Sequence, residues 1–293
     1  MNKLMDDQQL DPELQVIIRT VLAMKSGESS ASEAVSSLRR FIASVGRYGE
    51  TPFLWTMAGC GELPQAFCRL SAVFGATYCL EASLTDLDSE NDHFKFSFKG
   101  TEKKCNFIVG SISNFHSISQ GVIPSLMKSS HVACLTTKSL TESDEGRTSL
   151  LRIESASEGI TVIELGYSSL CVPKGLYLVH LNCPSVKSAK EDLMPVVEKL
   201  FSTSPDSNRK PSLIWALFYN ISFLPGSMLV NDTLLSHSSN MFIVNGPVLE
   251  MDYAQCINEA RSVFQLIFPG EDFLPKAPDA EDILIENDDG VIE

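Results

Sequence analysis

The chain is poor in positive charge: its 293 residues include 23 Lys and Arg against 37 Asp and Glu, which gives a net charge of −14. Proteins bind nucleic acids and anionic membranes mainly through clustered lysine and arginine, so this balance disfavours both kinds of partner. The sequence also lacks an apolar run of about 18 residues, which a membrane-spanning helix needs, and it lacks the apolar core of a signal peptide near Met1. We therefore expect a cytoplasmic protein without a membrane span.

Motifs for metal binding and catalysis are missing too. The eight cysteines form no C-x-x-C pair and the five histidines form no H-E-x-x-H pattern. We interpret the cysteines as small core residues in a reducing compartment. Gly59 and Gly61 could begin a phosphate-binding loop, but the third glycine is missing and Glu62 would repel a phosphate, which favours a tight turn. These absences predict no metal, no cofactor and no catalytic residue.

Two amphipathic helices are predicted near the start of the chain. Asp11 is a good N-cap, Pro12 fits the first helical position, and an apolar stripe follows. The second helix begins at a capping box formed by Ser30 and Glu33 and ends at Gly46. Two short helices cannot bury both of their stripes, so further elements must cover them.

From Thr51 onward the pattern indicates a mixed α/β fold. A turn at Gly59–Gly61 leads into a third helix, which Pro64 should open and Gly75 should close. Short alternating or apolar segments between polar turns predict a substantial antiparallel or mixed sheet. The predicted strands are Ala76–Leu80, Phe94–Phe98, Cys105–Val109, Val132–Thr136, Leu150–Ile153, Ile160–Leu165, Leu176–Leu181, Ser212–Asn220 and Met241–Val244, and the predicted later helices are Ser188–Phe201 and Asp252–Phe268.

Two later segments carry specific expectations. Pro195 should kink its helix or mark a late start, because proline lacks an amide proton. Glu271–Glu293 has nine acidic residues and one lysine, which predicts a mostly extended, solvated tail.

Glu62 and Arg69 are seven residues apart at the start of the third helix, about 10 Å along its axis and on nearly the same side. This distance is too long for a mutual ion pair but suits two polar anchors on one partner surface. A plain solvated helix face is the alternative interpretation.

A more specific signal is the string Gly61-Glu62-Leu63-Pro64-Gln65 with Phe67, Arg69 and Tyr78 after it. The segment Thr51–Leu80 resembles the Rab GDP-dissociation-inhibitor and Rab escort protein superfamily. The segments that resemble the escort branch in particular are Phe67-Cys68-Arg69, Tyr78-Cys79-Leu80, Gly175–Leu181, Lys187–Phe201 and Ile214–Leu217.

The resemblance implies the family fold, in which a large domain related to flavin-dependent oxidoreductases carries a smaller helical domain. The chain resembles its C-terminal portion. Residues 1–48 match the last helices of the helical domain, residues 49–270 match the C-terminal part of the large domain, and residues 271–293 form the acidic tail. The N-terminal half, with its glycine-rich loop, has no counterpart here. Because that loop serves no flavin in this family, the resemblance implies no cofactor.

The resemblance also implies which residues meet partners. The helix over 13–24 matches the face that meets the prenyltransferase, where Ile17 replaces an aromatic anchor, with ordinary core packing as the alternative. Cys79 stands where the inhibitors have methionine. The positions that match the Rab-binding platform are Glu62, Arg69, Thr77, Tyr78 and Cys79.

The implied function is that of a Rab escort protein and not of an enzyme. Such a chaperone binds GDP-bound Rab GTPases, presents them to Rab geranylgeranyl transferase and shields the added prenyl lipid. The alternatives are a Rab GDP-dissociation inhibitor, a truncated fragment without activity and, on fold ancestry alone, a flavin oxidoreductase.

Overall fold

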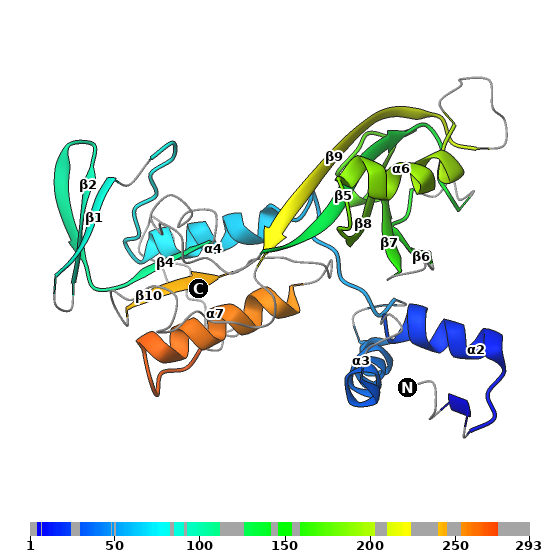
Figure 1. Cartoon of the computed structure of the whole chain (residues 1–293), viewed down its shortest axis with the longest axis horizontal. Coiled ribbons are helices and arrows are strands. Elements are labelled where there is room, and N and C mark those ends of the chain that lie inside the picture. Colours follow the sequence, from blue (N-terminus) through cyan, green and yellow to red (C-terminus); the bar gives the residue numbers. More distant parts are fainter. Residues whose placement is uncertain are drawn as a thin grey trace, which may run out of the picture. The chain divides into compact units, whose positions relative to one another are not determined.

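The computed structural model describes residues 5–6, 8–24, 30–47, 49, 51–82, 85–90, 93–111, 126–141, 146–153, 159–202, 210–223, 240–244 and 253–274. The chain divides into two units. The first comprises Met1–Ala82 and Ser125–Phe223, and the second comprises Ser83–Pro124 and Leu224–Glu293. Each unit combines helices with strands, which confirms the predicted α/β class (Figure 1). The predicted domain boundaries at residues 48 and 270 stay a prediction.

An antiparallel five-stranded sheet is the centre of the first unit. Its strands lie in the order β6-β7-β8-β5-β9. In this register Val132 of β5 pairs with Leu181 of β8 on one side and with Phe218 of β9 on the other. Each strand overlaps a segment predicted from its apolar pattern, and their bounds are β5 Met127–Thr136, β6 Ser149–Ile153, β7 Ile160–Leu165, β8 Tyr177–Pro184 and β9 Leu213–Phe223.

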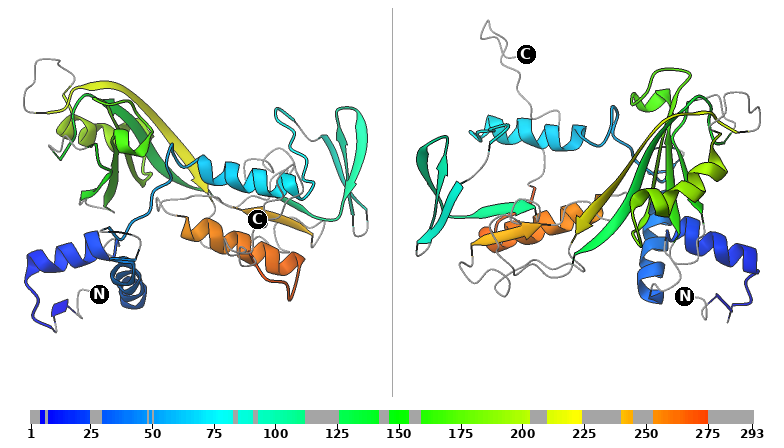
Figure 2. Two further views of the ribbon diagram at one scale, coloured as in Figure 1. Left: turned by 180° about the vertical axis from the view of Figure 1, so that it is seen from behind. Right: turned by 45° about the horizontal axis from the view of Figure 1, so that its top comes forward.

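Helix α6 (Ala189–Leu200) packs against β5, β8 and β9 and covers one face of the sheet (Figures 1 and 2). It begins at a capping box in which Ser188 and Glu191 each bond the other's backbone N–H. Pro195 lies inside the helix, so the predicted late start was wrong, because the capping box fixes the first turn upstream of the proline. The core between helix and sheet comprises Val132, Cys134, Ile160, Val162, Val179, Leu181, Cys183, Leu193, Val197 and Phe201.

A polar network fastens the start of α6 to the sheet. The Asp192 carboxylate accepts hydrogen bonds from Ser130 Oγ at 2.7 Å and from the N–H groups of Val186 and Lys187 at 3.1 Å. Asn220 Nδ2 of β9 donates to the same Ser130 Oγ at 2.9 Å. Burial opposes ionisation of Asp192, but the hydrogen bonds outweigh it and lower its pKa. The network ties α6 to two strands at once.

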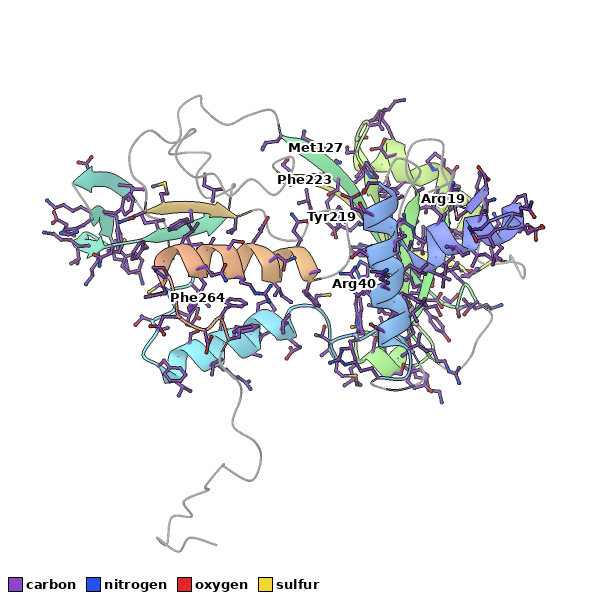
Figure 3. The ribbon with its side chains drawn as sticks, turned by 90° about the horizontal axis from the view of Figure 1, so that it is seen from below. Arg19, Arg40, Met127, Tyr219, Phe223 and Phe264 are labelled. Carbon is purple, nitrogen blue, oxygen red and sulfur yellow. The ribbon has the colours of Figure 1, made fainter. Side chains whose placement is uncertain are left out.

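The other face of the sheet holds a histidine pair. His131 of β5 is buried, its Nε2 lies 2.8 Å from Ser129 Oγ, and its ring stacks on Tyr219 of β9 with the centroids 5.2 Å apart. Tyr219 is labelled in Figure 3. Burial, with a smaller contribution from His180, lowers the pKa of His131 to about 4. Burial lowers the pKa of His180 as well. His131 is therefore neutral at physiological pH.

The N-terminal helices follow the predicted caps. Helix α2 (Pro12–Val16) begins where Asp11 Oδ1 accepts a hydrogen bond from the Glu13 N–H at 2.9 Å, and it continues as the π-helix η1 (Ile17–Leu22). Helix α3 (Ala31–Ser44) begins at the capping box of Ser30 and ends two residues before Gly46. Both predicted N-caps are confirmed.

The described residues of the second unit form two small sheets and one helix. Strands β1 (Thr85–Glu90), β2 (His93–Phe98) and β3 (Thr101–Cys105) form an antiparallel meander. Strands β4 (Ile108–Ser111) and β10 (Met241–Val244) pair in parallel, and α7 spans Ala254–Ile267. The prediction of one strand over Cys105–Val109 was wrong, because the chain leaves the meander at Cys105 and enters a different sheet at Ile108.

The remaining expectations concern the cysteines, the acidic tail and the absence of a membrane span. Cys134 and Cys183 are buried in the core, whereas Cys60 and Cys79 are exposed, so the interpretation as core residues fails for those two. None of the eight cysteines, all of which the structure describes, forms a disulfide. From residue 275 onward, the predicted acidic tail lies outside the described residues. Across the part of the chain that the structure describes, the helices are too short or too polar to cross a bilayer.

Candidate functional site

The turn before helix α4 (Glu62–Val73) is anchored to the first unit through the 3-10 helix η2 (Tyr167–Ser169). The Ala58 N–H donates to the Ser169 carbonyl at 2.8 Å, and Thr56 Oγ1 donates to the Gly59 carbonyl at 2.9 Å. Gly59 has a φ of +110°, a backbone conformation that residues with a side chain rarely adopt. The predicted tight turn into a helix is therefore present.

Helix α4 begins at Glu62, two residues before the predicted start at Pro64. The prediction placed the proline at the first helical position, but proline is tolerated throughout the first turn, where amide protons have no partner within the helix. Glu62 and Arg69 are both exposed, and at 100° a residue they lie within about 20° of each other around the axis. The structure thus places both predicted anchors on one open side of α4.

The apolar side of α4 is also exposed. Its residues recur at helical spacing about 110° around the axis from Glu62. Phe74 is 83% exposed, and Phe67 and Leu70 are each about half exposed. A surface that covered this side would leave Glu62 and Arg69 in solvent. The apolar stripe consists of Leu63, Phe67, Leu70 and Phe74.

The triplet Thr77-Tyr78-Cys79 follows α4 as irregular backbone, so the predicted strand Ala76–Leu80 was wrong. The reason is the helix end: Gly75 has a φ of +90°, and the Ala76 N–H bonds back to the Ser71 carbonyl at 3.0 Å. The Tyr78 hydroxyl lies 2.5 Å from Ser71 Oγ. The segment is thus folded onto the last turn of α4 and is not extended into a sheet.

Tyr78 does not share the side of α4 that carries the two charged anchors. Ser71 lies about 160° around the helix from Arg69, so the Tyr78 hydroxyl sits on the far side from the guanidinium. Thr77 and Cys79 are exposed. The structure therefore brings Glu62 and Arg69 together and places Tyr78 around the C-terminal end of the same helix.

Ile17, the predicted prenyltransferase-facing residue, is 48% exposed at the start of η1. Leu14 of α2 and Val21 of η1 are exposed to a similar extent. This outward stripe makes ordinary core packing a poor account of these three positions. It forms an apolar surface separate from that of α4 in sequence and in secondary structure.

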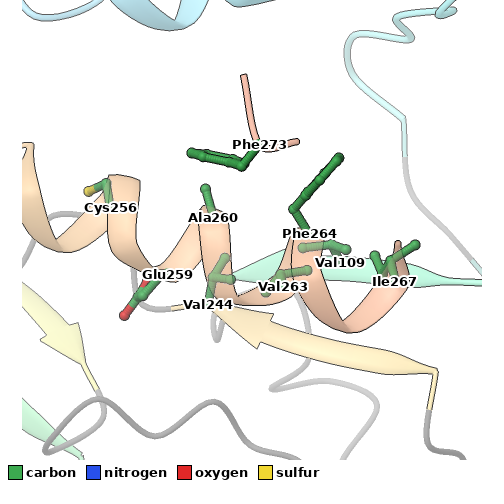
Figure 4. A pocket seen from close by; sticks show the side chains of 9 residues that line it. All are labelled: Val109, Val244, Cys256, Glu259, Ala260, Val263, Phe264, Ile267 and Phe273. Atoms are coloured by element: carbon green, nitrogen blue, oxygen red, sulfur yellow. The ribbon is translucent and has the colours of Figure 1, made fainter. Parts of the chain in front are cut away.

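A cavity of about 430 Å³ opens beside α7 in the second unit (Figure 4). Glu259, the one carboxylate among the described residues that line it, accepts a hydrogen bond from Gln255 and points away from Phe273. The described residues contain no group of three Cys, His, Asp or Glu side chains that could hold a metal. The cavity suits an apolar group, and it is lined by Val109, Val244, Cys256, Glu259, Ala260, Val263, Phe264, Ile267 and Phe273.

Comparison with known proteins decides the family. The profile described as "GDP dissociation inhibitor" matches residues 1–153. The chain belongs to this family. A second profile, "RAE1/2 domain I, C-terminal region", matches residues 130–249. Together the two profiles span residues 1–249, which include the whole of the first unit.

The relatives of this family member include two named after a prenyltransferase component. "Rab proteins geranylgeranyltransferase component A 1" from Homo sapiens is 33% identical, over 96% of this chain and 45% of its own length. "Rab proteins geranylgeranyltransferase component A" from Drosophila melanogaster is 31% identical, over 96% of this chain and 54% of its own length. The chain thus spans about half the length of the curated relatives it matches.

A solved structure supports the fold of this family member. The crystal structure of Rab GDI from Plasmodium falciparum aligns with a TM-score of 0.66 over 91% of this chain and 59% of that one, at 12% identity. The family resemblance and the GDI-like fold predicted from the sequence are confirmed. The individual site residues stay predictions. Sequence reasoning missed Ser71, whose contact with Tyr78 depends on a turn that no motif in the sequence marks.

Proposed function

We propose that the chain acts as a Rab escort protein. It binds GDP-bound Rab GTPases in the cytoplasm, presents them to Rab geranylgeranyl transferase and shields the added prenyl lipid, and it catalyses no reaction itself. Two findings support this proposal over the inhibitor role: relatives named component A align over 96% of the chain, and the RAE1/2 profile matches residues 130–249.

The geometry of α4 carries the proposal. Glu62 and Arg69 are exposed on one side of a helix whose start is fastened to η2 through the Ala58–Ser169 hydrogen bond. A carboxylate and a guanidinium held about 10 Å apart can each make charge-assisted hydrogen bonds to one protein surface. We assign them to the Rab, with Thr77, Tyr78 and Cys79 as further contacts.

A second surface suits the transferase. The exposed stripe of Leu14, Ile17 and Val21 offers an apolar patch on α2 and η1, away in sequence from the proposed Rab contacts. Apolar side chains grouped on one helical face are a common means of protein docking. We assign this stripe to the prenyltransferase, with Ile17 at its centre.

Rab binding is tested with Arg69→Ala. Loss of a charge-assisted contact in a desolvated interface costs about 2–5 kcal/mol, which is roughly thirtyfold or more in affinity. Titration of the purified chain with a GDP-loaded Rab measures this loss of affinity. Arg39→Ala is the matched control, since Arg39 is an exposed helical arginine on α3. Equal affinities for the wild type and both variants would remove the proposed Rab site.

Two alternatives are separated by a second experiment. A GDP-dissociation inhibitor captures prenylated Rabs but not the transferase, whereas an escort protein captures both the Rab and the transferase. Pull-down with purified Rab and purified transferase, repeated with Ile17→Asp, distinguishes them. Capture of neither partner would favour a fragment without activity of its own.

A further inference from the structure

Ser71 joins the last turn of α4 to the segment that follows it. Its hydroxyl donates to the Phe67 carbonyl at 2.6 Å and lies 2.5 Å from the Tyr78 hydroxyl. Its backbone carbonyl accepts from the N–H groups of Phe74 and Ala76 at 3.1 and 3.0 Å. One residue therefore closes the helix end with its backbone and holds a tyrosine with its side chain.

The direction of these hydrogen bonds follows from counting protons. A serine hydroxyl has a single proton, and that of Ser71 goes to the Phe67 carbonyl. Tyr78 must then be the donor to Ser71 Oγ. Because its proton is used inside the protein, the Tyr78 oxygen keeps its lone pairs for a donor on a partner, and Tyr78 is 52% exposed.

We propose that Ser71 is a positioning residue for Tyr78 in partner binding. The inference rests on the proposed Rab-binding function, in which Tyr78 is one of the contacts. A free tyrosine side chain loses rotamer freedom when an interface immobilises it, and this loss weakens binding. The hydrogen bond to Ser71 removes that freedom beforehand. The partner presents an N–H or O–H donor to the phenol oxygen.

Ser71 acts through Tyr78 and not through Arg69. The serine lies about 160° around α4 from the arginine, so the two groups touch different parts of a partner. Effects of substitutions at such separate sites add, whereas effects within one hydrogen-bonded pair do not. The coupling pattern therefore distinguishes a positioning role of Ser71 from a general loosening of the helix.

The experiment uses the full chain with Ser71→Ala, Tyr78→Phe, both together, and Ser71→Thr. Against a GDP-loaded Rab, Ser71→Ala and Tyr78→Phe should each weaken binding about two- to twelvefold. The double variant should bind no more weakly than Tyr78→Phe alone, and Ser71→Thr should keep the wild-type affinity. Arg69→Ala combined with Tyr78→Phe should show additive losses. Stability should not fall with Ser71→Ala, because alanine is the better helix former.

A second readout does not depend on Rab. The chain is labelled with 3-fluorotyrosine at its six tyrosines, and Tyr78→Phe identifies the fluorine resonance of Tyr78. Ser71→Ala should move that resonance toward the position of free 3-fluorotyrosine, and Ser71→Thr should not. An unmoved resonance, or additive losses for Ser71→Ala and Tyr78→Phe, would overturn the inference. If the wild type binds no Rab, the proposed function fails, and the fluorine spectrum alone decides the role of Ser71.

Discussion

In the first unit the apolar side of helix α6 is buried, whereas the apolar side of helix α4 is exposed. Leu193 and Val197 of α6 are fully buried against the five-stranded sheet, and Asp192 fastens the start of that helix to β5. On α4, Leu70 and Phe74 are 52% and 83% exposed. Both helices are amphipathic, so the sequence pattern alone does not tell a helix that is covered from one that is open.

The difference shows what each helix contributes. Helix α6 supplies much of the core of the first unit, whereas α4 depends on its anchored turn and on the hydrogen bonds that the Ser71 backbone carbonyl accepts at its end. A helix held by its ends keeps both of its sides available to partners. Stability and binding are therefore carried by different helices, and substitutions should separate the two.

The largest expected effect contrasts Leu193→Ala with Leu70→Ala. Leu193 has no exposed surface, so its truncation leaves a cavity and should lower the free energy of unfolding by about 2–5 kcal/mol. Leu70→Ala should lower the free energy of unfolding by less than about 1 kcal/mol, because Leu70 is already about half exposed to water. Urea denaturation followed by circular dichroism measures both. Equal losses would mean that the α4 stripe is covered in solution.

A smaller change in stability depends on pH and comes from a histidine in the five-stranded sheet. The pKa of His131 is lowered to about 4 in the folded protein, against an ordinary value near 6.5 in the unfolded chain. Between these values the unfolded chain binds the extra proton, so stability is complete above about pH 6.5 and falls as the pH drops toward 4. At pH 5 the loss from His131 should be about 2 kcal/mol, and His180 adds to it in the same direction.

Unfolding midpoints at pH 7.5, 6 and 5 test this expectation, with His131→Gln as the variant. The lowered pKa of Asp192 acts in a more acidic range, below its ordinary value near 4, and does not interfere. The slope of stability against pH should flatten in the variant. An unchanged slope would assign the pH dependence to other groups.

Local signals in the sequence predicted the helix starts well. Asp11, Ser30 and Ser188 cap their helices through residues two or three positions away, so the information lies within one turn. Pairing between strands that are distant in the chain was harder to predict from the sequence. The single strand expected over Cys105–Val109 breaks because β4 pairs with β10, more than 130 residues further along the chain.

The candidate site could likewise be predicted only where it depends on local helix geometry. Glu62 and Arg69 share a side because a helix has a fixed period, and the sequence shows that directly. The position of Tyr78 depends on how the chain turns at Gly75 and on which side of α4 it folds against, and Ser71 settles that through a contact seven residues away. Such a contact has no signature in the sequence until the turn is known.

The smallest expected change in stability comes from Phe74→Ser, which tests whether the α4 stripe is open. Phe74 is 83% exposed, so its loss should change the free energy of unfolding by less than about 0.5 kcal/mol. Exposed apolar side chains in a row favour association between molecules, so the same substitution should shift the chain toward monomer. Sedimentation velocity over a range of concentrations measures this shift. Gln65→Ser is the control, because Gln65 is exposed on the side of α4 that carries Arg69. A wild-type chain that stays monomeric at every concentration, or a control that dissociates equally, would mean that the stripe does not drive association and that its exposure has another use.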